Sequence, residues 1–195
     1  MKKDIILSGV GGQGILSIAA VIGEAAMAAG LHIKQAEVHG MSQRGGDVHS
    51  NLRISSRPVH SDLIARGSAD LIISLEPMEA LRYLPWLAGD GWVVASSAPF
   101  VNIPNYPDHG ELLAELRALP RAVVFDVDVA AREAEVARAA NIVLLGAAAA
   151  ATGLDPEALR QAVRKIFGRK GDAVVEMNLV AFETGLAVAV KNSKI

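Results

Sequence analysis

The sequence predicts an α/β fold in three layers, a Rossmann-like and mostly parallel sheet with helices on both faces, followed by a helical C-terminal third. Apolar runs of strand length alternate with helical patterns through residues 1–140, and only helical patterns follow. The composition agrees, because 51% of the residues are hydrophobic and only 4% are aromatic. Small aliphatic side chains of this kind suit helices that lie close to a sheet.

The first predicted elements are an apolar strand over residues 4–8, a glycine-rich turn over 9–14 and a long apolar helix over 14–29. The turn has the pattern G-x-G-x-x-G. Such glycines allow a tight turn with uncovered backbone N–H groups, and the positive end of the helix dipole faces that turn. The pattern also serves simple close packing of a helix on a sheet, so alone it is a weak indication of an anion site.

The next two strand patterns cover residues 31–37 and 47–55, and nine residues separate them. A parallel neighbour would need a crossover of about a dozen residues or more. We therefore expect the second and third strands to form an antiparallel hairpin. If the second strand runs parallel to the first, the polar loop of the hairpin and the glycine turn lie at the same end of the sheet.

These two loops form the predicted ligand site. Backbone N–H groups of the first loop would bind an anion, and side chains of the second loop would join them, with a planar arginine fork that suits phosphate. The predicted binding residues are Gly11, Gly12, Gln13, Gly14, Ser42, Gln43, Arg44, Gly45 and Gly46.

No catalytic residue is predicted, because the sequence has no Ser–His–acid spacing, no metal-ligand spacing and no Walker lysine. His39 and His49 flank the second loop. They are either a proton shuttle or, the favoured interpretation, groups that hydrogen-bond nearby backbone at turn and strand ends.

Strand and helix patterns alternate again after residue 58. The predicted elements are a strand over 70–75, a helix over 77–87, a strand over 92–97, a loop over 98–110, a helix over 111–119 and a strand over 122–127. Glu76 and Glu79 are either a carboxylate pair at the end of a strand, where open sheets bind ligands, or acids that complement the helix dipole, which is favoured. Residues 89–91 read Gly-Asp-Gly, like the start of a thiamine-diphosphate motif, but the asparagines of that motif are missing and a turn is predicted.

The last third is predicted to contain three helices. Asn141 is expected to cap the first, in which Gly146 and neighbouring alanines allow another element to approach closely. The second begins at residues 155–157 and has an apolar stripe at helical spacing. The stripe consists of Leu159, Ala162, Val163, Ile166 and Phe167. The third helix, over 172–190, is so apolar that we expect another chain to cover part of it.

The length of 195 residues suits one domain, with a core over residues 1–140 and the helices of 141–195 packed on it. The first residues lack the apolar run and cleavage site of a signal peptide. No transmembrane segment is predicted, because the longest nearly uncharged stretch, 142–154, is too short to span a bilayer. We therefore expect a cytoplasmic protein.

Charge and cysteine content narrow the classes of function. The formal net charge is −2, which gives no reason to expect nucleic-acid binding. The sequence contains no cysteine, so the chain has no disulfide and cannot by itself hold an ordinary iron–sulfur cluster. Any redox metal must therefore belong to a partner.

The two loops together, over residues 9–14 and 37–46, resemble those of the gamma subunit or domain of 2-oxoacid:ferredoxin oxidoreductases. Other similar positions are residues 67–70 and 76–80, Asn141, Asn178 and Gly185. The resemblance extends over nearly the whole chain. Within the family, the chain is most similar to the beta subunit of indolepyruvate:ferredoxin oxidoreductases.

This resemblance implies a two-chain enzyme that oxidatively decarboxylates a 2-oxoacid, indolepyruvate or another aryl pyruvate, to its acyl-CoA while reducing ferredoxin. Thiamine diphosphate, magnesium and iron–sulfur clusters would lie on the larger alpha chain. The present chain would be inactive alone and would have an architectural role. Its two loops would face the partner, with Arg44 and the glycine cradle as a contact for coenzyme A.

Two other classes of function remain open. A stand-alone NAD-binding dehydrogenase would use the glycines and Glu37, which lies at the right distance to bind a ribose hydroxyl but could equally be a solvated strand end. A purely structural interaction subunit would have an empty cradle. In isolation the chain could also form a homo-oligomer.

Overall fold

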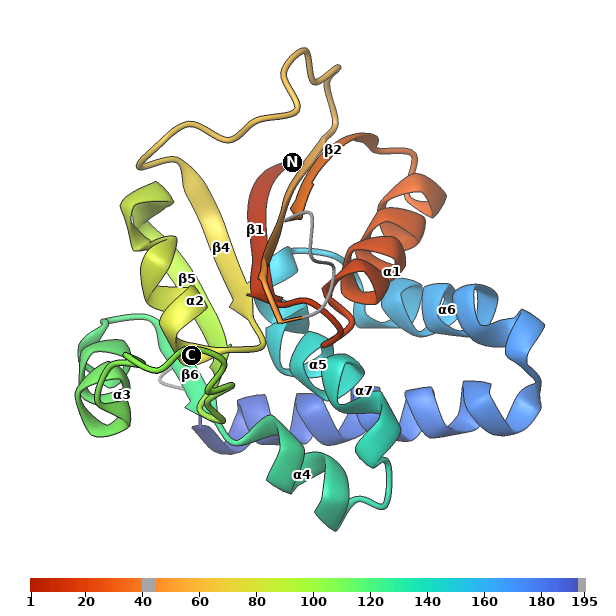
Figure 1. Cartoon of the computed structure of the whole chain (residues 1–195). Coiled ribbons are helices and arrows are strands. Elements are labelled where there is room, and N and C mark those ends of the chain that lie inside the picture. Colours follow the sequence, from red (N-terminus) through yellow and green to blue (C-terminus); the bar gives the residue numbers. More distant parts are fainter. Residues whose placement is uncertain (40–44, 193–195) are drawn as a thin grey trace.

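The computed structural model describes residues 1–39 and 45–192, and shows one six-stranded sheet in the order β2-β3-β1-β4-β5-β6 (Figure 1). The strands are β1 (Lys2–Val10), β2 (His32–His39), β3 (Asp47–Ser55), β4 (Ala69–Ser74), β5 (Leu87–Ser96) and β6 (Ala122–Phe125). β1, β4, β5 and β6 are parallel neighbours. β3 is antiparallel to both β1 and β2. The predicted mostly parallel sheet and its antiparallel hairpin are both confirmed.

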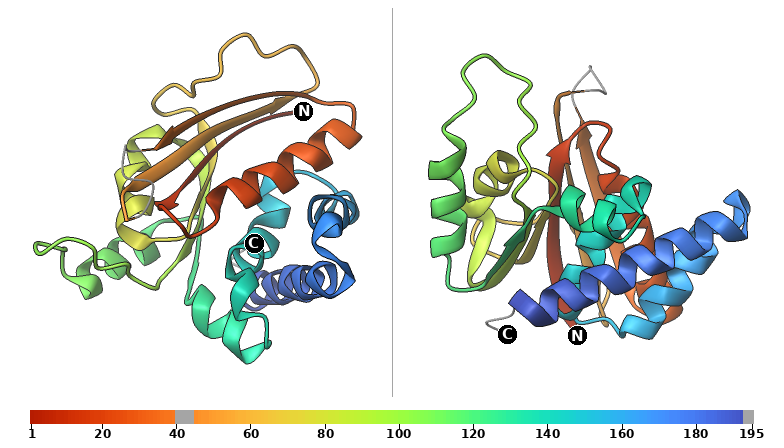
Figure 2. Two further views of the ribbon diagram at one scale, coloured as in Figure 1. Left: turned by 45° about the vertical axis from the view of Figure 1, so that its right-hand side comes forward. Right: turned by 90° about the horizontal axis from the view of Figure 1, so that it is seen from below.

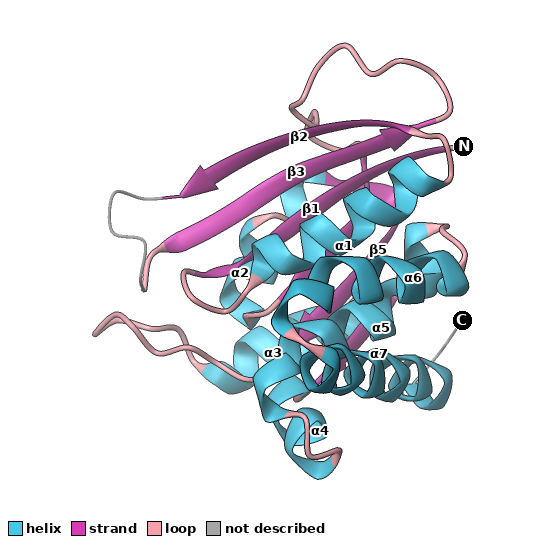
Figure 3. Cartoon of the chain, turned by 90° about the vertical axis from the view of Figure 1, so that its right-hand side faces the viewer, coloured by secondary structure: helices cyan, strands magenta, loops and turns pink. Residues whose placement is uncertain are grey.

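The direction of β3 decides where the loops lie. Because β3 runs opposite to both of its neighbours, β1 and β2 run in the same direction. The loops that follow β1 and β2 therefore lie at the same end of the sheet, as required for the predicted site. Figure 3 shows β2, β3 and β1 side by side, with the end of β1 and the start of β3 at the same end of the sheet.

Helices cover both faces of the sheet and give three layers (Figure 2). They are α1 (Ile15–Ala28), α2 (Pro77–Arg82), α3 (His109–Ala118), α4 (Val127–Glu133), α5 (Ala140–Thr152), α6 (Pro156–Phe167) and α7 (Asp172–Asn192). The larger core lies between the sheet and the layer that includes α1 and α5. The smaller core lies under α2 and α3, around Ile6, Ile72 and Tyr83.

Helices α5 and α7 cross at backbone distance. A Cβ built on Gly146 would lie 2.1 Å from the carbonyl oxygen of Phe182, and one built on Gly185 would lie 2.0 Å from that of Val143. Only glycine fits at both positions. This confirms the close approach that the small residues of α5 predicted. The stripe of α6 is also confirmed, because Leu159, Ala162, Val163 and Phe167 are buried and Ile166 packs against the core.

Some predicted boundaries were wrong. Helix α2 ends at Arg82 and a short 3₁₀ turn, η1 (Leu84–Trp86), follows, because Pro85 cannot donate to a continuing helix. Strand β5 then starts at Leu87 rather than Trp92, so residues 89–91 lie in a strand and not in a turn. The predicted strand over 122–127 ends at Phe125, where Asp126 caps the unpredicted helix α4.

Helix α7 is the one helix in the described part of the chain that is long and apolar enough to cross a membrane. No transmembrane segment had been predicted from the sequence. Within the fold, α7 packs against α5 and α6, and 39% of its apolar window is buried. This packing accounts for only part of its apolar surface. The expected cover by another chain stays a prediction.

Candidate functional site

The two glycine loops meet directly. The Gly11 N–H donates to the Gly46 carbonyl at 2.9 Å, and the Gly45 N–H donates to the Gly11 carbonyl at 3.4 Å. The juxtaposition predicted from strand direction is therefore confirmed for these glycines. Ser42, Gln43 and Arg44 lie outside the described residues.

Within the first loop, some of the predicted donors are already used. The Gln13 side chain accepts from the Val10 N–H at 2.7 Å and donates to the Leu75 carbonyl at 3.1 Å, so it fixes the loop instead of facing a ligand. The Gln13 N–H itself donates to the Val10 carbonyl. Among the described residues, the amides of Gly12 and Gly14 have no acceptor. A Cβ on Gly12 would meet nothing within 4 Å, so open space faces this part of the turn.

Helix α1 begins beside that space without a side-chain cap. A cavity of about 310 Å³ lies there, lined by the glycines of the first loop and by the apolar side chains of Val10, Ile15, Leu16 and Val48. Backbone N–H groups at a helix start attract anions. The arrangement thus combines an anion-binding turn with an apolar wall.

Asn141 holds this helix start from the other side, and its prediction as a cap of α5 was wrong. It lies inside α5, whose N-cap position is Ala139 with no side-chain bond. The Asn141 amide donates instead to the Gly14 carbonyl at 3.0 Å. A Cβ on Gly14 would lie 2.7 Å from that amide nitrogen, so this glycine and this asparagine fit each other.

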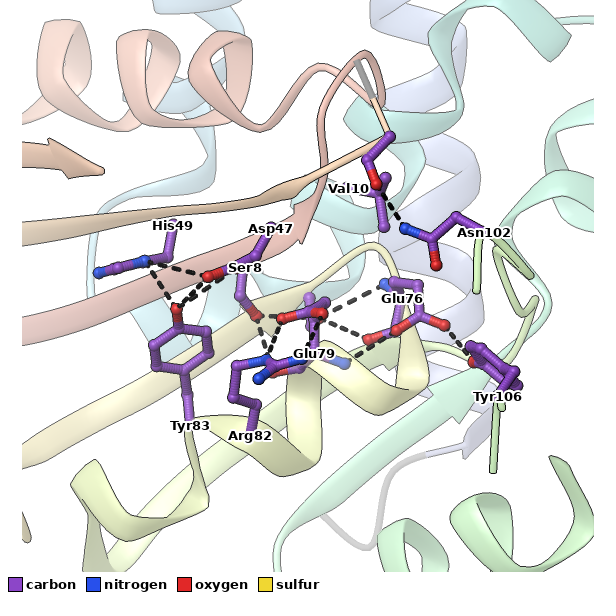
Figure 4. A network of polar contacts seen from close by, with 12 residues as sticks. Ser8, Val10, Asp47, His49, Glu76, Glu79, Arg82, Tyr83, Asn102 and Tyr106 are labelled. Atoms are coloured by element: carbon purple, nitrogen blue, oxygen red, sulfur yellow. Dashed lines mark hydrogen bonds and ion pairs between the residues drawn. The ribbon is translucent and has the colours of Figure 1, made fainter. Parts of the chain in front are cut away.

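A network of partly buried polar side chains lies at the start of β3 (Figure 4). Asp47, the first residue of β3, hydrogen-bonds with the Glu79 carboxyl and accepts from the Tyr83 hydroxyl at 3.1 Å. The Tyr83 hydroxyl lies 2.6 Å from Nδ1 of His49, and Arg82 donates to Glu79 at 2.7 Å. The favoured interpretation was that His49 hydrogen-bonds nearby backbone, whereas this contact is with a side chain.

The pKa values of the two carboxyls are shifted in opposite directions. Burial raises the pKa of Glu79, and the nearby charge of Asp47 raises it further, against the effect of Arg82. Burial also acts to raise the pKa of Asp47, but hydrogen bonds with His49, Glu79 and Tyr83 outweigh it and the pKa is lowered. As pH falls, Glu79 therefore takes up a proton before Asp47 does.

This pair predicts a specific dependence of stability on pH. Because the Glu79 pKa is raised in the folded state, the free energy of unfolding should fall as pH rises from the ordinary value of 4.5 through the folded value. Because the Asp47 pKa is lowered, stability should also fall as pH drops below 3.8. Urea unfolding over that pH range measures both slopes.

The variant Glu79→Gln keeps the carboxyl shape without the titration, so the decline on the alkaline side should flatten. Glu183→Gln is the matched control, since Glu183 makes an ion pair with Arg160 and its side chain is 52% exposed. Equal slopes in the wild type and in Glu79→Gln would show that the pKa of Glu79 is not raised in the folded state.

Glu76 is fully buried and connects a third loop to the site. Its side chain accepts from the Glu79 N–H at 2.8 Å, so Glu76 is the N-cap of α2, and Glu79 lies in the first turn of that helix. Its other oxygen accepts from the Phe100 N–H at 3.3 Å and from the Tyr106 hydroxyl. The Asn102 amide of the same loop donates to the Gly45 carbonyl. Sequence reasoning missed these loop residues, whose partners lie in remote segments.

The structure also bears on the roles considered for Glu37, for His39 and for a metal site. Glu37 is exposed and accepts from Gln35 at 2.7 Å. Because β3 lies between β2 and β1, Glu37 is two strand spacings, about 10 Å, from β1, unlike a dinucleotide fold. In register it lies level with Leu7 and not with the glycine turn. The side chain of His39 lies outside what the structure describes. Across residues 1–39 and 45–192, no group of three or more acidic, histidine or cysteine side chains could hold a metal.

The fold and these loops define an α/β subunit that presents a ligand cradle without a set of catalytic side chains among its described residues. The chain belongs to the pyruvate ferredoxin/flavodoxin oxidoreductase family, which its residues 4–188 match. Over 201 residues it is 35% identical to indolepyruvate oxidoreductase subunit IorB of Methanothermobacter thermautotrophicus, covering 98% of this chain and 100% of that protein.

Solved structures agree. The gamma subunit of a keto/oxoacid ferredoxin oxidoreductase from Geobacter sulfurreducens superposes with a TM-score of 0.70 at 28% identity, over 97% of this chain and 99% of that one. The 2-oxoglutarate:ferredoxin oxidoreductase from Magnetococcus marinus, with coenzyme A bound, superposes with a TM-score of 0.77 at 23% identity. The match covers all of this chain and 32% of that longer one. The present chain is thus of the small-subunit type of 2-oxoacid:ferredoxin oxidoreductases.

Proposed function

We propose that this chain is the small subunit of a cytoplasmic enzyme that oxidatively decarboxylates indolepyruvate or another aryl pyruvate to its acyl-CoA and reduces ferredoxin. The full-length similarity to an indolepyruvate oxidoreductase subunit supports this substrate class. The observation that carries the role of this chain is the pair of hydrogen-bonded glycine loops, with two amides that no described residue uses.

The chemistry of decarboxylation and electron transfer would belong to a larger alpha subunit. The sequence has no cysteine to hold an iron–sulfur cluster. Residues 89–91, the only part of the sequence like a thiamine-diphosphate motif, lie in β5 and do not fit that cofactor. We therefore assign thiamine diphosphate, magnesium and the clusters to the partner, and expect this chain to be inactive alone.

The ligand of this chain would be coenzyme A, through its diphosphate. The amides of Gly12 and Gly14 and the start of α1 would hold the anion, and Arg44 would add a charged fork. The apolar wall beside them suits the less polar arm of the same molecule. Coenzyme A bound in the Magnetococcus enzyme supports the choice of ligand.

Arg44→Ala tests this contact. Losing a charge-assisted hydrogen bond of about 1.5–3 kcal/mol should raise the apparent KM for coenzyme A about 10- to 100-fold in the reconstituted enzyme, with a smaller effect on kcat. Arg57→Ala is the control, because Arg57 is exposed and follows β3 at the opposite end of the sheet. An unchanged KM, with assembly intact, would favour a purely structural subunit.

Assembly is tested first, by recovering the tagged chain from its source and identifying bound proteins by mass spectrometry. We expect a larger, cysteine-rich, thiamine-binding chain at a ratio near one to one. Recovery of a homo-oligomer alone would refute the subunit assignment. Tight NADH binding by that homo-oligomer would then favour the dehydrogenase alternative.

A further inference from the structure

The loop between β5 and α3, residues 97–108, exposes apolar side chains at its tip. Phe100, Val101 and Ile103 are 42%, 69% and 37% exposed. Among the described residues, no other four-residue stretch contains three exposed large apolar side chains. Figures 2 and 3 show this loop projecting away from the body of the fold. Solvent exposure of such a cluster is unfavourable unless something covers it.

The loop is fixed at its base. Glu76 accepts from the Tyr106 hydroxyl and from the Phe100 N–H, and the ring of His109 lies 2.7 Å from the Ser97 carbonyl. Three prolines within the loop restrict the backbone further. These bonds and prolines restrict the conformations of the loop before any partner binds, which lowers the entropic cost of association.

The loop also belongs to the same end of the sheet as the glycine loops. Asn102 donates to the Gly45 carbonyl, so the third loop directly contacts the second (Figure 4). Any surface that covers the tip therefore lies next to the proposed coenzyme A site.

We propose that the tip formed by Phe100, Val101 and Ile103 docks on the larger subunit of the enzyme. This rests on the proposed function, because coenzyme A held at the glycine loops has to react on the larger subunit. That end of the sheet must consequently face the larger subunit and not a second copy of this chain. In the Magnetococcus enzyme the same fold makes up 32% of a longer chain.

Val101→Lys tests the docking, since a charge at the most exposed of the three positions should not disturb folding. Met27→Lys is the matched control, because Met27 is 59% exposed and lies in the last turn of α1, away from the glycine loops. The larger subunit is titrated with each variant, and the concentration that gives half-maximal activity is measured at saturating coenzyme A. We expect at least a tenfold increase for Val101→Lys, no change for Met27→Lys and an unchanged KM for coenzyme A at saturating subunit.

Tyr106→Phe provides a second test that keeps the apolar tip. Losing its hydrogen bond to Glu76 should loosen the loop and give a smaller increase in the half-saturating concentration. If Val101→Lys gives the same half-saturating concentration as the wild type, the docking proposal is overturned, while the proposed function is unaffected. The docking proposal is also overturned if sedimentation shows that Val101→Lys only dissociates a homodimer of this chain. If the wild-type chain itself never activates the larger subunit, the proposed function fails instead.

Discussion

Gly185→Ala is expected to lower the free energy of unfolding by about 3 kcal/mol or more, above the usual cost of an overpacked core. The added methyl group would lie 2.0 Å from the Val143 carbonyl oxygen and 2.7 Å from the Ala147 nitrogen. Both atoms belong to the backbone of α5, so no side chain can rotate away. The two helices would have to separate, and α5 would lose its packing on α7. Urea unfolding followed by circular dichroism measures the loss.

Gly23→Ala is the control for the same chemical change in a helix. Gly23 lies inside α1, and a Cβ there would meet nothing within 4 Å. Alanine has the better helix propensity by about 1 kcal/mol, so this variant should be as stable as the wild type or more stable. Gly146→Ala should behave like Gly185→Ala, because it meets the Phe182 carbonyl at 2.1 Å. A stable Gly185→Ala protein would mean that α5 and α7 can separate at little cost.

The strand directions were predictable because they follow from chain length. Nine residues cannot cross over a sheet, and this limit alone gave the hairpin of β2 and β3. The end of α2 and the start of β5 were harder to predict. Pro85 stands near the end of a pattern that otherwise reads as helical, and the glycines of β5 are poor strand formers. There, Leu87 pairs with Ala69 and Trp92 with Leu71, so residues 88–91 lie in an irregular stretch of the β4–β5 pair.

The site was predictable only at the level of backbone. The meeting of the glycine loops followed from topology, but the roles of individual side chains did not. Asn141 contacts Gly14 across 127 positions in the sequence, and Tyr106 contacts Glu76 across 30. The opposite pKa shifts of Asp47 and Glu79 likewise depend on burial and contacts that only the folded chain creates. A sequence pattern shows only the spacing of residues that are close along the chain. These contacts join residues that are far apart along the chain, so no such pattern predicts them.

Removing either partner of the Asp4–Arg53 ion pair is expected to have an equally large effect. The Asp4 carboxylate is almost fully buried in β1, and Arg53 of β3 donates to both its oxygens, at 2.8 and 3.1 Å. The same guanidinium donates to the carbonyls of Ser61 and Leu63 and so anchors the long loop after β3. Arg53→Met should lower the free energy of unfolding by about 3–5 kcal/mol, since it leaves a buried carboxylate without its main partner.

A double-mutant cycle separates this loss from simple packing. Asp4→Leu should cost a similar amount, but the Asp4→Leu, Arg53→Met double variant should cost much less than the sum, because neither charge is then buried alone. Lys2→Met is the control, since Lys2 contacts Asp4 at 2.8 Å but its side chain is 57% exposed, and such pairs contribute about 1 kcal/mol or less. Strictly additive losses would show that the two side chains stabilise the fold independently. The stability of the β1–β3 pair would then come from the sheet itself and not from the charges across it.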